Sequence, residues 1–179
     1  MRLFIAINLP KQVKDYLFEL KDEFRGLGKF NFTAKSKYHI TMKFFGEIKE
    51  DKLEEIKERL SSVKFSSFET SLDELGHFNS RVLWVNIKPN EKVLSLARKI
   101  DEQVIEFPNI HDFSFHITLA RIKSIKDKKM FEEKLKAEVK KLKFGINSFE
   151  LMKSILSKDG AKYEILEAYR ASTITNLKY

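Results

Sequence analysis

The spacing of apolar residues divides the chain into strand-like and helix-like segments. Apolar residues three and four positions apart predict helices over residues 11–24, 50–63, 90–107 and 127–142. Alternating or continuous apolar stretches predict strands over residues 2–9, 38–46, 68–78, 81–89 and 114–123, with one more on each side of the turn SKDGAK at 157–162. The segment GHFNS predicts a hairpin turn between the third and fourth of these strands.

This loosely repeating order of strands and helices indicates an α+β fold with a largely antiparallel sheet. Asn90 follows a proline and is expected to cap the third helix, while Ser124 with Asp127 resembles a capping box before the fourth. No Gly-, Ser- or Pro-rich linker divides the chain. We therefore expect residues 1–179 to form one domain, built of two small lobes that share a core.

The composition predicts a soluble, cytoplasmic protein. No apolar run is long enough to span a membrane, the N-terminus lacks a signal peptide pattern, and the absence of cysteine excludes disulfides and thiolate metal sites. The formal net charge is +8, from 34 basic and 26 acidic residues, which suits an anionic partner such as nucleic acid. The lysines also alternate with glutamates along the predicted helices, which is equally typical of solvated helix faces and of thermophile surfaces.

The tripeptide His-Ile-Thr occurs twice, at residues 39–41 and 116–118, each time inside a predicted strand. Because residues i and i+2 of a strand point to the same face, each strand presents an imidazole and a hydroxyl together, opposite an apolar face. With four histidines and six threonines in the chain, two His-x-Thr pairs arise by accident in about 1% of cases. The other histidines, His77 and His111, lie in apparent loops and are expected at the surface.

Two imidazoles and two hydroxyls around one small space supply the groups for displacement at a phosphodiester. Histidine titrates near neutral pH, so one ring can act as a general base while the other acts as a general acid. Threonine hydroxyls can donate hydrogen bonds to the non-bridging oxygens of a phosphate and hold it in line. Spacings that favour a metal site, such as His-x-His or His-x-x-x-His, do not occur, so we expect no metal here.

The paired motifs, in HITMKFFGE and FHITLARIK, resemble those of the 2H phosphoesterases. They most resemble the bacterial and archaeal RNA 2′,3′-cyclic phosphodiesterases, also called the 2′-5′ RNA ligase family. The segments MRLFIAINLP, SRVLWVNI and LMKSILSKDGAKYEIL are similar to that family as well, so the resemblance covers nearly the whole chain. It implies a two-lobed α+β fold, with two antiparallel sheets related by a pseudo-twofold around a central cleft and with helices on the outside.

The resemblance further implies hydrolysis of an RNA 2′,3′-cyclic phosphate end to a 2′-phosphate, with no metal or nucleotide cofactor. It also implies a weaker reverse reaction that joins RNA ends, such as tRNA halves, through a 2′-5′ linkage. By carry-over, His39 is the proton donor to the leaving oxygen and His116 is the proton acceptor that activates water. Thr41 and Thr118 bind the phosphate. The two motifs are symmetric, so the residues alone do not assign acid and base.

Three neighbouring residues are further candidates for substrate binding. Lys43 lies four residues from His39, on the same face of a regular strand, where it would neutralise phosphate or extend into solvent. Phe45 falls on that face too, and would stack on a base or join the core. Strict alternation places Arg121 opposite His116, so Arg121 reaches a phosphate only if its strand bends or ends there.

Two other functions stay open on the sequence. A hydrolase of small cyclic nucleotides or of ADP-ribose cyclic phosphate would use the same chemistry, although the basic surplus favours RNA, which offers further phosphates. A non-catalytic RNA-binding or tRNA-processing module would use the histidines only as phosphate contacts. The basic surface suits a monomer, and no membrane association is expected.

Overall fold

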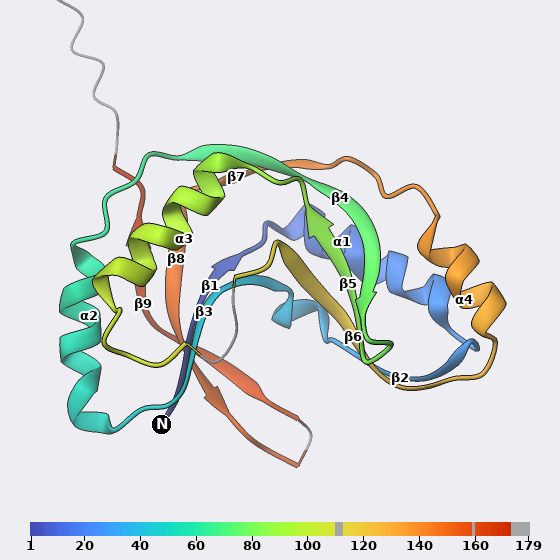
Figure 1. Ribbon diagram of the computed structural model, residues 1–179, viewed down its shortest axis with the longest axis horizontal. Coiled ribbons are helices and arrows are strands. Elements are labelled where there is room, and N and C mark those ends of the chain that lie inside the picture. The colour runs from blue at the N-terminus through green and yellow to red at the C-terminus, as the bar shows by residue number, and fades with distance from the viewer. Residues whose placement is uncertain (110–112, 159, 173–179) are drawn as a thin grey trace, which may run out of the picture.

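The computed structural model describes residues 1–109, 113–158 and 160–172, and its strands form two antiparallel sheets (Figure 1). The first sheet has the order β3-β1-β8-β9, with β1 Arg2–Asn8, β3 His39–Glu47, β8 Ser148–Ile155 and β9 Lys162–Arg170. The second has the order β2-β6-β5-β4-β7, with β2 Gly28–Phe32, β4 Phe68–Phe78, β5 Val82–Ile87, β6 His116–Ile125 and β7 Lys143–Ile146. Each sheet therefore contains one His-Ile-Thr strand, β3 or β6.

Helices lie on the outer sides of the two sheets (Figure 1). They are α1 Lys11–Leu20, which continues as the 3-10 helix η1 Lys21–Phe24, then α2 Leu53–Ser61, α3 Glu91–Gln103 and α4 Lys128–Leu135, with short 3-10 helices η2 Lys35–Lys37 and η3 Glu50–Lys52. α2 and α3 pack beside the first sheet and α4 beside the second. The predicted α+β fold with antiparallel sheets is confirmed. None of the described helices is long and apolar enough to cross a membrane.

The apolar faces of the two His-Ile-Thr strands belong to one continuous core that both sheets share. Tyr38, Ile40 and Met42 beside the first motif, and Ile117 and Leu119 beside the second, are at most 4% exposed. Each large apolar side chain buried in this way stabilises the fold by roughly 1.5–3 kcal/mol relative to an exposed one. The apolar face of each strand is thus held in the core, and the opposite face carries the histidine and the threonine.

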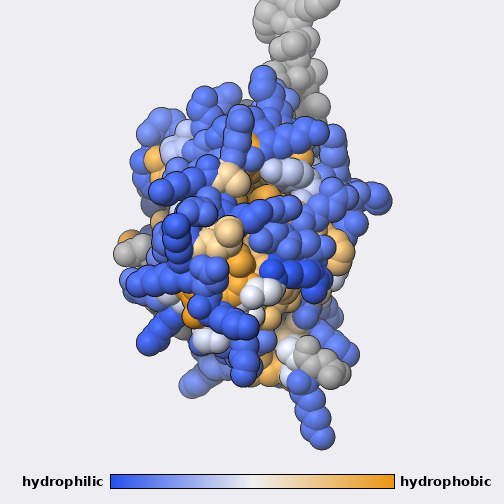
Figure 2. Space-filling model, turned by 90° about the vertical axis from the view of Figure 1, so that its right-hand side faces the viewer, coloured by the Kyte–Doolittle hydropathy of each residue, from blue (hydrophilic) through white to orange (hydrophobic). Residues whose placement is uncertain are grey.

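Charged side chains cover the outside of the molecule. Figure 2 shows hydrophilic residues over most of one face, with apolar residues visible between them. Many of the charges pair along a helix, as Lys11 does with Asp15 at 2.8 Å and Arg59 with Glu55 at 3.0 Å. Exposed pairs of this kind add little to stability, and they account for part of the lysine and glutamate alternation seen in the sequence.

The last helix is shorter than its sequence pattern predicts. The pattern extends over residues 127–142, but α4 ends at Leu135. The chain beyond it turns inward, since Val139 is 2% exposed and the Lys140 N–H donates a hydrogen bond to the Tyr16 hydroxyl at 2.8 Å. These contacts with other elements outweigh the helical propensity of the segment.

One expected helix cap is confirmed and the other is shifted. Asn90 Oδ1 accepts a hydrogen bond from the Lys92 N–H at 2.8 Å and caps α3. At α4, Asp127 accepts from the Met130 N–H at 2.9 Å. The N-cap is therefore Asp127, and Ser124 lies inside β6.

The apolar run that predicts a single strand before the turn at 157–162 is divided between the two sheets. β7 pairs with β4 in the second sheet, whereas β8 pairs with β1 and β9 in the first. The chain changes sheet at Asn147, whose carbonyl accepts a hydrogen bond from the Ala171 N–H at 2.8 Å. β2, with the half-polar sequence GKFNF, is an additional strand that the pattern does not predict.

Candidate active site

The two His-Ile-Thr strands occupy related positions in the two sheets. His39 and His116 are the first residues of β3 and β6. Each lies opposite an asparagine of the neighbouring strand, Asn8 of β1 or Asn86 of β5. The strands differ in that β3 is an edge strand of its sheet, while β6 runs between β2 and β5.

His39 is oriented by a backbone carbonyl and by two aromatic rings. Its Nδ1 lies 2.7 Å from the Lys37 carbonyl oxygen, and its Nε2 lies 3.1 Å from Thr41 Oγ1. A carbonyl only accepts hydrogen bonds, so Nδ1 carries the hydrogen, and Nε2 of the neutral ring accepts one from the Thr41 hydroxyl. The rings of Phe4 and Tyr163 lie 5.2 and 5.5 Å from the imidazole centroid. The tautomer and the direction of Nε2 are therefore fixed.

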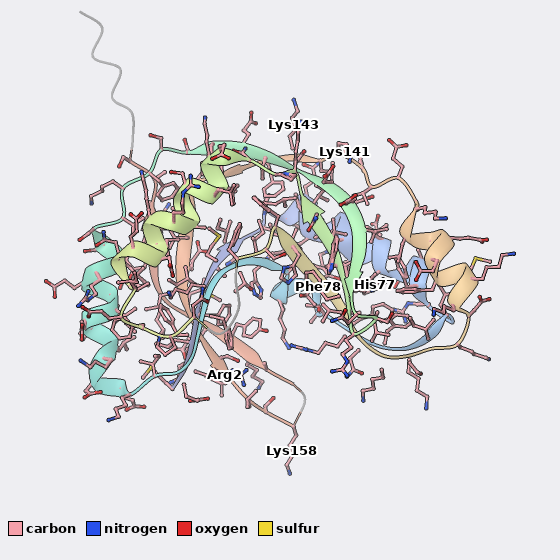
Figure 3. The ribbon with its side chains drawn as sticks, in the orientation of Figure 1. Arg2, His77, Phe78, Lys141, Lys143 and Lys158 are labelled. Carbon is pink, nitrogen blue, oxygen red and sulfur yellow. The ribbon has the colours of Figure 1, made fainter. Side chains whose placement is uncertain are left out.

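His116 is packed against aromatic residues of the second sheet. Its ring meets Phe78 edge-on at 4.9 Å, and Phe78 lies 5.4 Å from the indole of Trp84. The indole crosses Gly76, where an added Cβ would come 2.2 Å from the ring, so a larger residue there would displace it. Figure 3 shows Phe78 at the end of β4. His116 Nδ1 is buried, and the backbone of Ser114 raises the pKa of the ring against the effect of burial.

The pKa values of both imidazoles are lowered in the folded protein. Burial lowers the pKa of both below the ordinary value of 6.5. For His39 the Lys37 carbonyl opposes this effect and raises the pKa, while the charges of His116 and Lys14 lower it further. The charge of His116 on the second sheet therefore acts on His39 of the first.

A β-bulge after Thr41 turns Lys43 away from the histidine. Thr41 and Lys43 oppose adjacent residues of β1, so the strict alternation of β3 is broken between them. The Lys43 side chain is 3% exposed on the opposite face, and its ammonium pairs with the Asp101 carboxylate of α3. The expectation that Lys43 shares the face of His39 is wrong, because it assumes a regular strand.

The same irregularity exchanges the environments of two phenylalanines. Phe45 is 1% exposed within the core, so the expectation that it lies on the histidine face is also wrong. Phe44 instead lies opposite Phe4, on the face that carries His39. The Arg2 guanidinium carbon lies 5.0 Å from the centroid of the Phe44 ring. Phe44 and Arg2 thus lie beside the site, although regular alternation along β3 does not predict this.

A corresponding bulge in β6 turns Arg121 toward the histidine. Thr118 lies opposite Trp84 and Arg121 lies opposite Val82, with a register shift between them. Trp84 and Val82 are two positions apart on β5 and point to the same face. Arg121 therefore shares the face of His116 and Thr118. This irregularity of β6 is the condition under which Arg121 is expected to reach a phosphate.

Tyr163 of β9 connects the two histidine-bearing faces. Its ring lies 5.5 Å from that of His39 and 5.0 Å from that of Phe4. Burial raises the pKa of its hydroxyl, and the charges of Arg121 and Arg2 lower it. Arg121 of the second sheet thus lies near a ring that packs on His39 of the first. No periodicity in the sequence marks Tyr163, although it lies within the segment that carries the family resemblance.

His77 does not join this arrangement. His77 lies in β4 rather than in a loop, where its Nδ1 accepts a hydrogen bond from the Ser80 N–H at 3.0 Å and its Nε2 lies 3.6 Å from the Glu132 carboxylate. His111 lies outside the described residues. Within the part of the chain that the structure describes, no three His, Asp or Glu side chains gather as metal ligands would.

The sequence matches a known protein family twice in tandem. The model of the LigT like phosphoesterase family matches residues 7–84 and again residues 85–163. Each match contains one His-Ile-Thr strand, in agreement with the related positions of β3 and β6 in the two sheets.

Relatives of similar length and fold come from archaea and bacteria. The RNA 2′,3′-cyclic phosphodiesterase of Methanocaldococcus jannaschii is 30% identical over 178 residues, which cover 94% of this chain and 100% of the relative. The protein of the same name from Archaeoglobus fulgidus is 30% identical over 180 residues, covering 94% and 99%. The crystal structure of TT0787 of Thermus thermophilus superposes with a TM-score of 0.80 at 26% identity, covering 95% of this chain and 97% of the other.

The structure of E. coli LigT complexed with 3′-AMP has the same fold, with a TM-score of 0.83 at 22% identity over 96% of this chain and 98% of the other. The resemblance to the 2H phosphoesterases noted in the sequence is confirmed by these matches. Together, the tandem family match and the full-length relatives show that this chain belongs to the LigT like phosphoesterase family.

Proposed function

We propose that this protein hydrolyses the 2′,3′-cyclic phosphate end of RNA to a 2′-phosphate by acid–base catalysis between two histidines. The observation that carries the proposal is the pair of His-Ile-Thr strands, which occupy corresponding positions in the two sheets, and the charge of His116 lowers the pKa of His39. Relatives at 30% identity are RNA 2′,3′-cyclic phosphodiesterases, which supports this substrate. Residues 1–179 would act as one two-lobed catalytic unit.

In the proposed reaction, each side chain has one role. Neutral His116 removes a proton from water as the water oxygen bonds to phosphorus. The bond from phosphorus to O3′ breaks, and protonated His39 donates its Nε2 proton to O3′, which leaves the phosphate on O2′. Thr41 and Thr118 donate hydrogen bonds to the non-bridging oxygens, and Arg121 offsets their charge. No step requires a metal ion, because the histidines transfer both protons.

The same groups would join two RNA ends when a 5′-hydroxyl takes the place of water. The hydroxyl would attack the cyclic phosphate, lose its proton to His116 and form the 2′-5′ linkage, while His39 protonates O3′. Halves of a cleaved tRNA carry ends of these two kinds. Ligation should be the slower of the two reactions, since water competes at every turnover.

The experiment that tests the proposal is hydrolysis of a nucleoside 2′,3′-cyclic phosphate and of a cyclic-phosphate-ended RNA in EDTA, with the 2′- and 3′-phosphate products separated. We expect turnover that EDTA leaves intact, and a 2′-phosphate product. A 3′-phosphate product would contradict the assigned leaving group. A requirement for added metal would contradict the two-histidine mechanism, and an absence of turnover on either substrate would favour a non-catalytic RNA-binding role.

The pH dependence of this reaction follows from the lowered pKa values. The free protein is competent when His39 is protonated and His116 is neutral, and both groups titrate below 6.5. The bell-shaped profile of kcat/KM should therefore be centred on the acidic side of neutrality. The bound cyclic phosphate is an anion and favours protonated imidazoles, so the profile of kcat should lie at higher pH than that of kcat/KM. Coincident profiles centred above about pH 7 would contradict the assignment.

A further inference from the structure

We propose that a lysine-lined pocket beside His39 binds a backbone phosphate of the RNA strand that carries the cyclic end. This inference rests on the proposed function and makes it more specific, because a single nucleotide has no such phosphate. The pocket is a cavity of about 650 Å³ at the end of β1, and its lining residues are Leu9, Lys11, Lys14, Lys35 and Ser36.

The pocket adjoins the first histidine through two segments of the chain. Leu9 directly follows Asn8, the β1 residue opposite His39. Lys35 and Ser36 belong to η2, and the carbonyl of Lys37 at the end of η2 is the partner of His39 Nδ1. A nucleotide whose phosphate lies at His39 would therefore lie beside this pocket, so the adjacent backbone phosphate of the same strand could enter it.

Lys14 of this pocket is hydrogen-bonded to Asn8, the β1 residue opposite His39. Its ammonium donates a hydrogen bond to Asn8 Oδ1 at 3.0 Å, and its charge lowers the pKa of His39. Burial lowers the pKa of Lys14 itself, against the attraction of Glu150. The Glu150 carboxylate is already bound by the Asn8 N–H at 3.1 Å and the Ser148 hydroxyl at 2.6 Å. No carboxylate of the described residues forms a direct ion pair with Lys14.

The rim of the pocket is also rich in positive charge. Lys11 and Lys35 both pair with Asp15, whose two carboxylate oxygens hold the ammonium groups in place. Counted together with Glu150, which attracts Lys14, two carboxylates face three ammonium groups, and this leaves one positive charge to be balanced. A phosphodiester brings one negative charge and two free oxygens, and ammonium groups bind such oxygens as compact point charges.

The test compares a cyclic-phosphate-ended trinucleotide with the matching nucleoside 2′,3′-cyclic phosphate. We expect the wild type to prefer the trinucleotide in kcat/KM. The double substitution Lys14→Gln and Lys35→Gln should lower that preference about tenfold, because the ammonium contacts to one phosphate are lost. It should also reduce the salt dependence of the preference by about 0.7 in the slope of log kcat/KM against log salt. Any effect of Lys14 on His39 alone acts on both substrates and cancels in the ratio.

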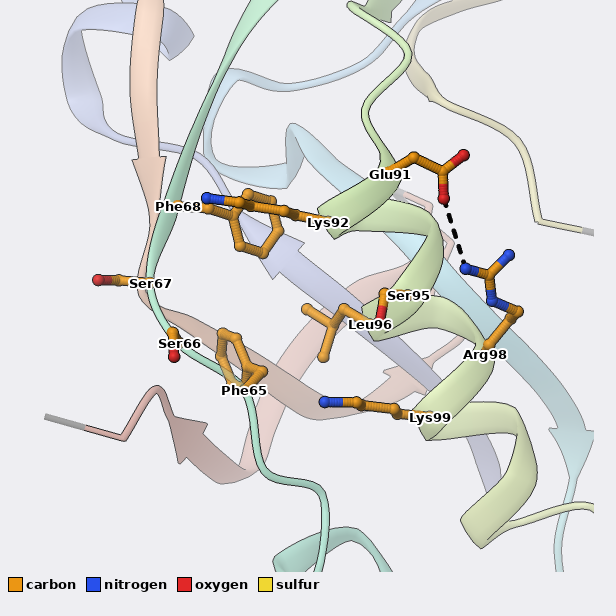
Figure 4. Close-up of a pocket in the computed structure, with 10 residues that line it drawn as sticks. All are labelled: Phe65, Ser66, Ser67, Phe68, Glu91, Lys92, Ser95, Leu96, Arg98 and Lys99. Atoms are coloured by element: carbon orange, nitrogen blue, oxygen red, sulfur yellow. Dashed lines mark hydrogen bonds and ion pairs between the residues drawn. The ribbon is translucent and has the colours of Figure 1, made fainter. Parts of the chain in front are cut away.

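A matched control is available on α3. Lys92 and Lys99 of α3 line a cavity of about 470 Å³ to which β3 and β6 contribute no residue (Figure 4). The double substitution Lys92→Gln and Lys99→Gln removes the same charge and should leave the preference for the trinucleotide at its wild-type value. The pair Lys14→Arg and Lys35→Arg should retain most of it, since the positive charge stays.

The outcomes separate the two proposals. Equal kcat/KM for both substrates in the wild type, or an equal loss of preference in the Lys92 and Lys99 control, would overturn the phosphate pocket and leave the catalytic proposal standing. No hydrolysis of either substrate by the wild type would overturn the proposed function, and the pocket proposal with it.

Discussion

Replacement of either His39 or His116 by alanine is expected to lower kcat/KM for a nucleoside 2′,3′-cyclic phosphate by about 10²–10⁴-fold. Each substitution removes one of the two proposed proton-transfer groups. The neighbouring threonine hydroxyls cannot replace an imidazole, because they do not titrate near neutral pH. Steady-state hydrolysis by both single variants, measured in EDTA across the pH range of the wild type, checks this expectation.

The double variant and a third histidine supply the controls. In the proposed mechanism both imidazoles act in one chemical step, so the double variant should lose little more activity than the more damaged single variant. His77→Ala removes a histidine that bonds the Ser80 N–H and points to the opposite face of β4 from Phe78, so it should keep near wild-type rates. A single His39 or His116 variant that keeps more than about a tenth of the activity would remove that histidine from the mechanism.

Thr41→Val and Thr118→Val are each expected to lower kcat by about 10²-fold, because valine has the shape of threonine but donates no hydrogen bond to the phosphate oxygens. The two variants should differ in their pH profiles. Thr41 donates to Nε2 of neutral His39, which favours the neutral ring, so Thr41→Val should raise the pKa of His39. Among the described residues His116 receives no such bond from Thr118, and Thr118→Val should reduce the rate with little shift of either limb.

Kinetics at several pH values distinguish these variants from general damage to the fold. Thr70→Val is a matched control, since Thr70 is buried in β4 and its hydroxyl points to the Lys88 carbonyl at 3.4 Å, outside the site. Thr41→Ser and Thr118→Ser, which keep the hydroxyl, should recover most of the activity. Equal activity of the valine and serine variants would show that the hydroxyls do not bind the transition state.

The histidine strands are well predicted from sequence because their pattern is local. Ile40 and Ile117 have to be buried if His39 and His116 are to face a common space, and both are fully buried. Alternation between the two faces is a property of each strand by itself. The pair of motifs is then sufficient to recognise the family, and the family model accordingly matches each half of the chain once.

Prediction from sequence fails where a strand depends on its neighbour. A β-bulge is set by the register between two strands, which no single strand records. Regular alternation therefore assigns Lys43 and Phe45 to the wrong face, and it places Arg121 only conditionally. Tyr163 escapes prediction for a related reason, because it reaches His39 through the order of strands in the sheet, and that order is not visible along the chain.

The two bulges make the repeated strands chemically different at one position. The fifth residue after each histidine reaches the histidine-bearing face, and it is Phe44 in β3 but Arg121 in β6. A 2′,3′-cyclic phosphate is itself nearly symmetric, since either ring oxygen can serve as the leaving group. Two identical strands would accept it in both orientations and yield a mixture of isomers. An aromatic ring at this position in one strand and a guanidinium in the other make those orientations unequal. Which phosphate isomer forms would therefore depend on the position at which the two strands differ, whereas hydrolysis itself would depend on the His-Ile-Thr residues that they share.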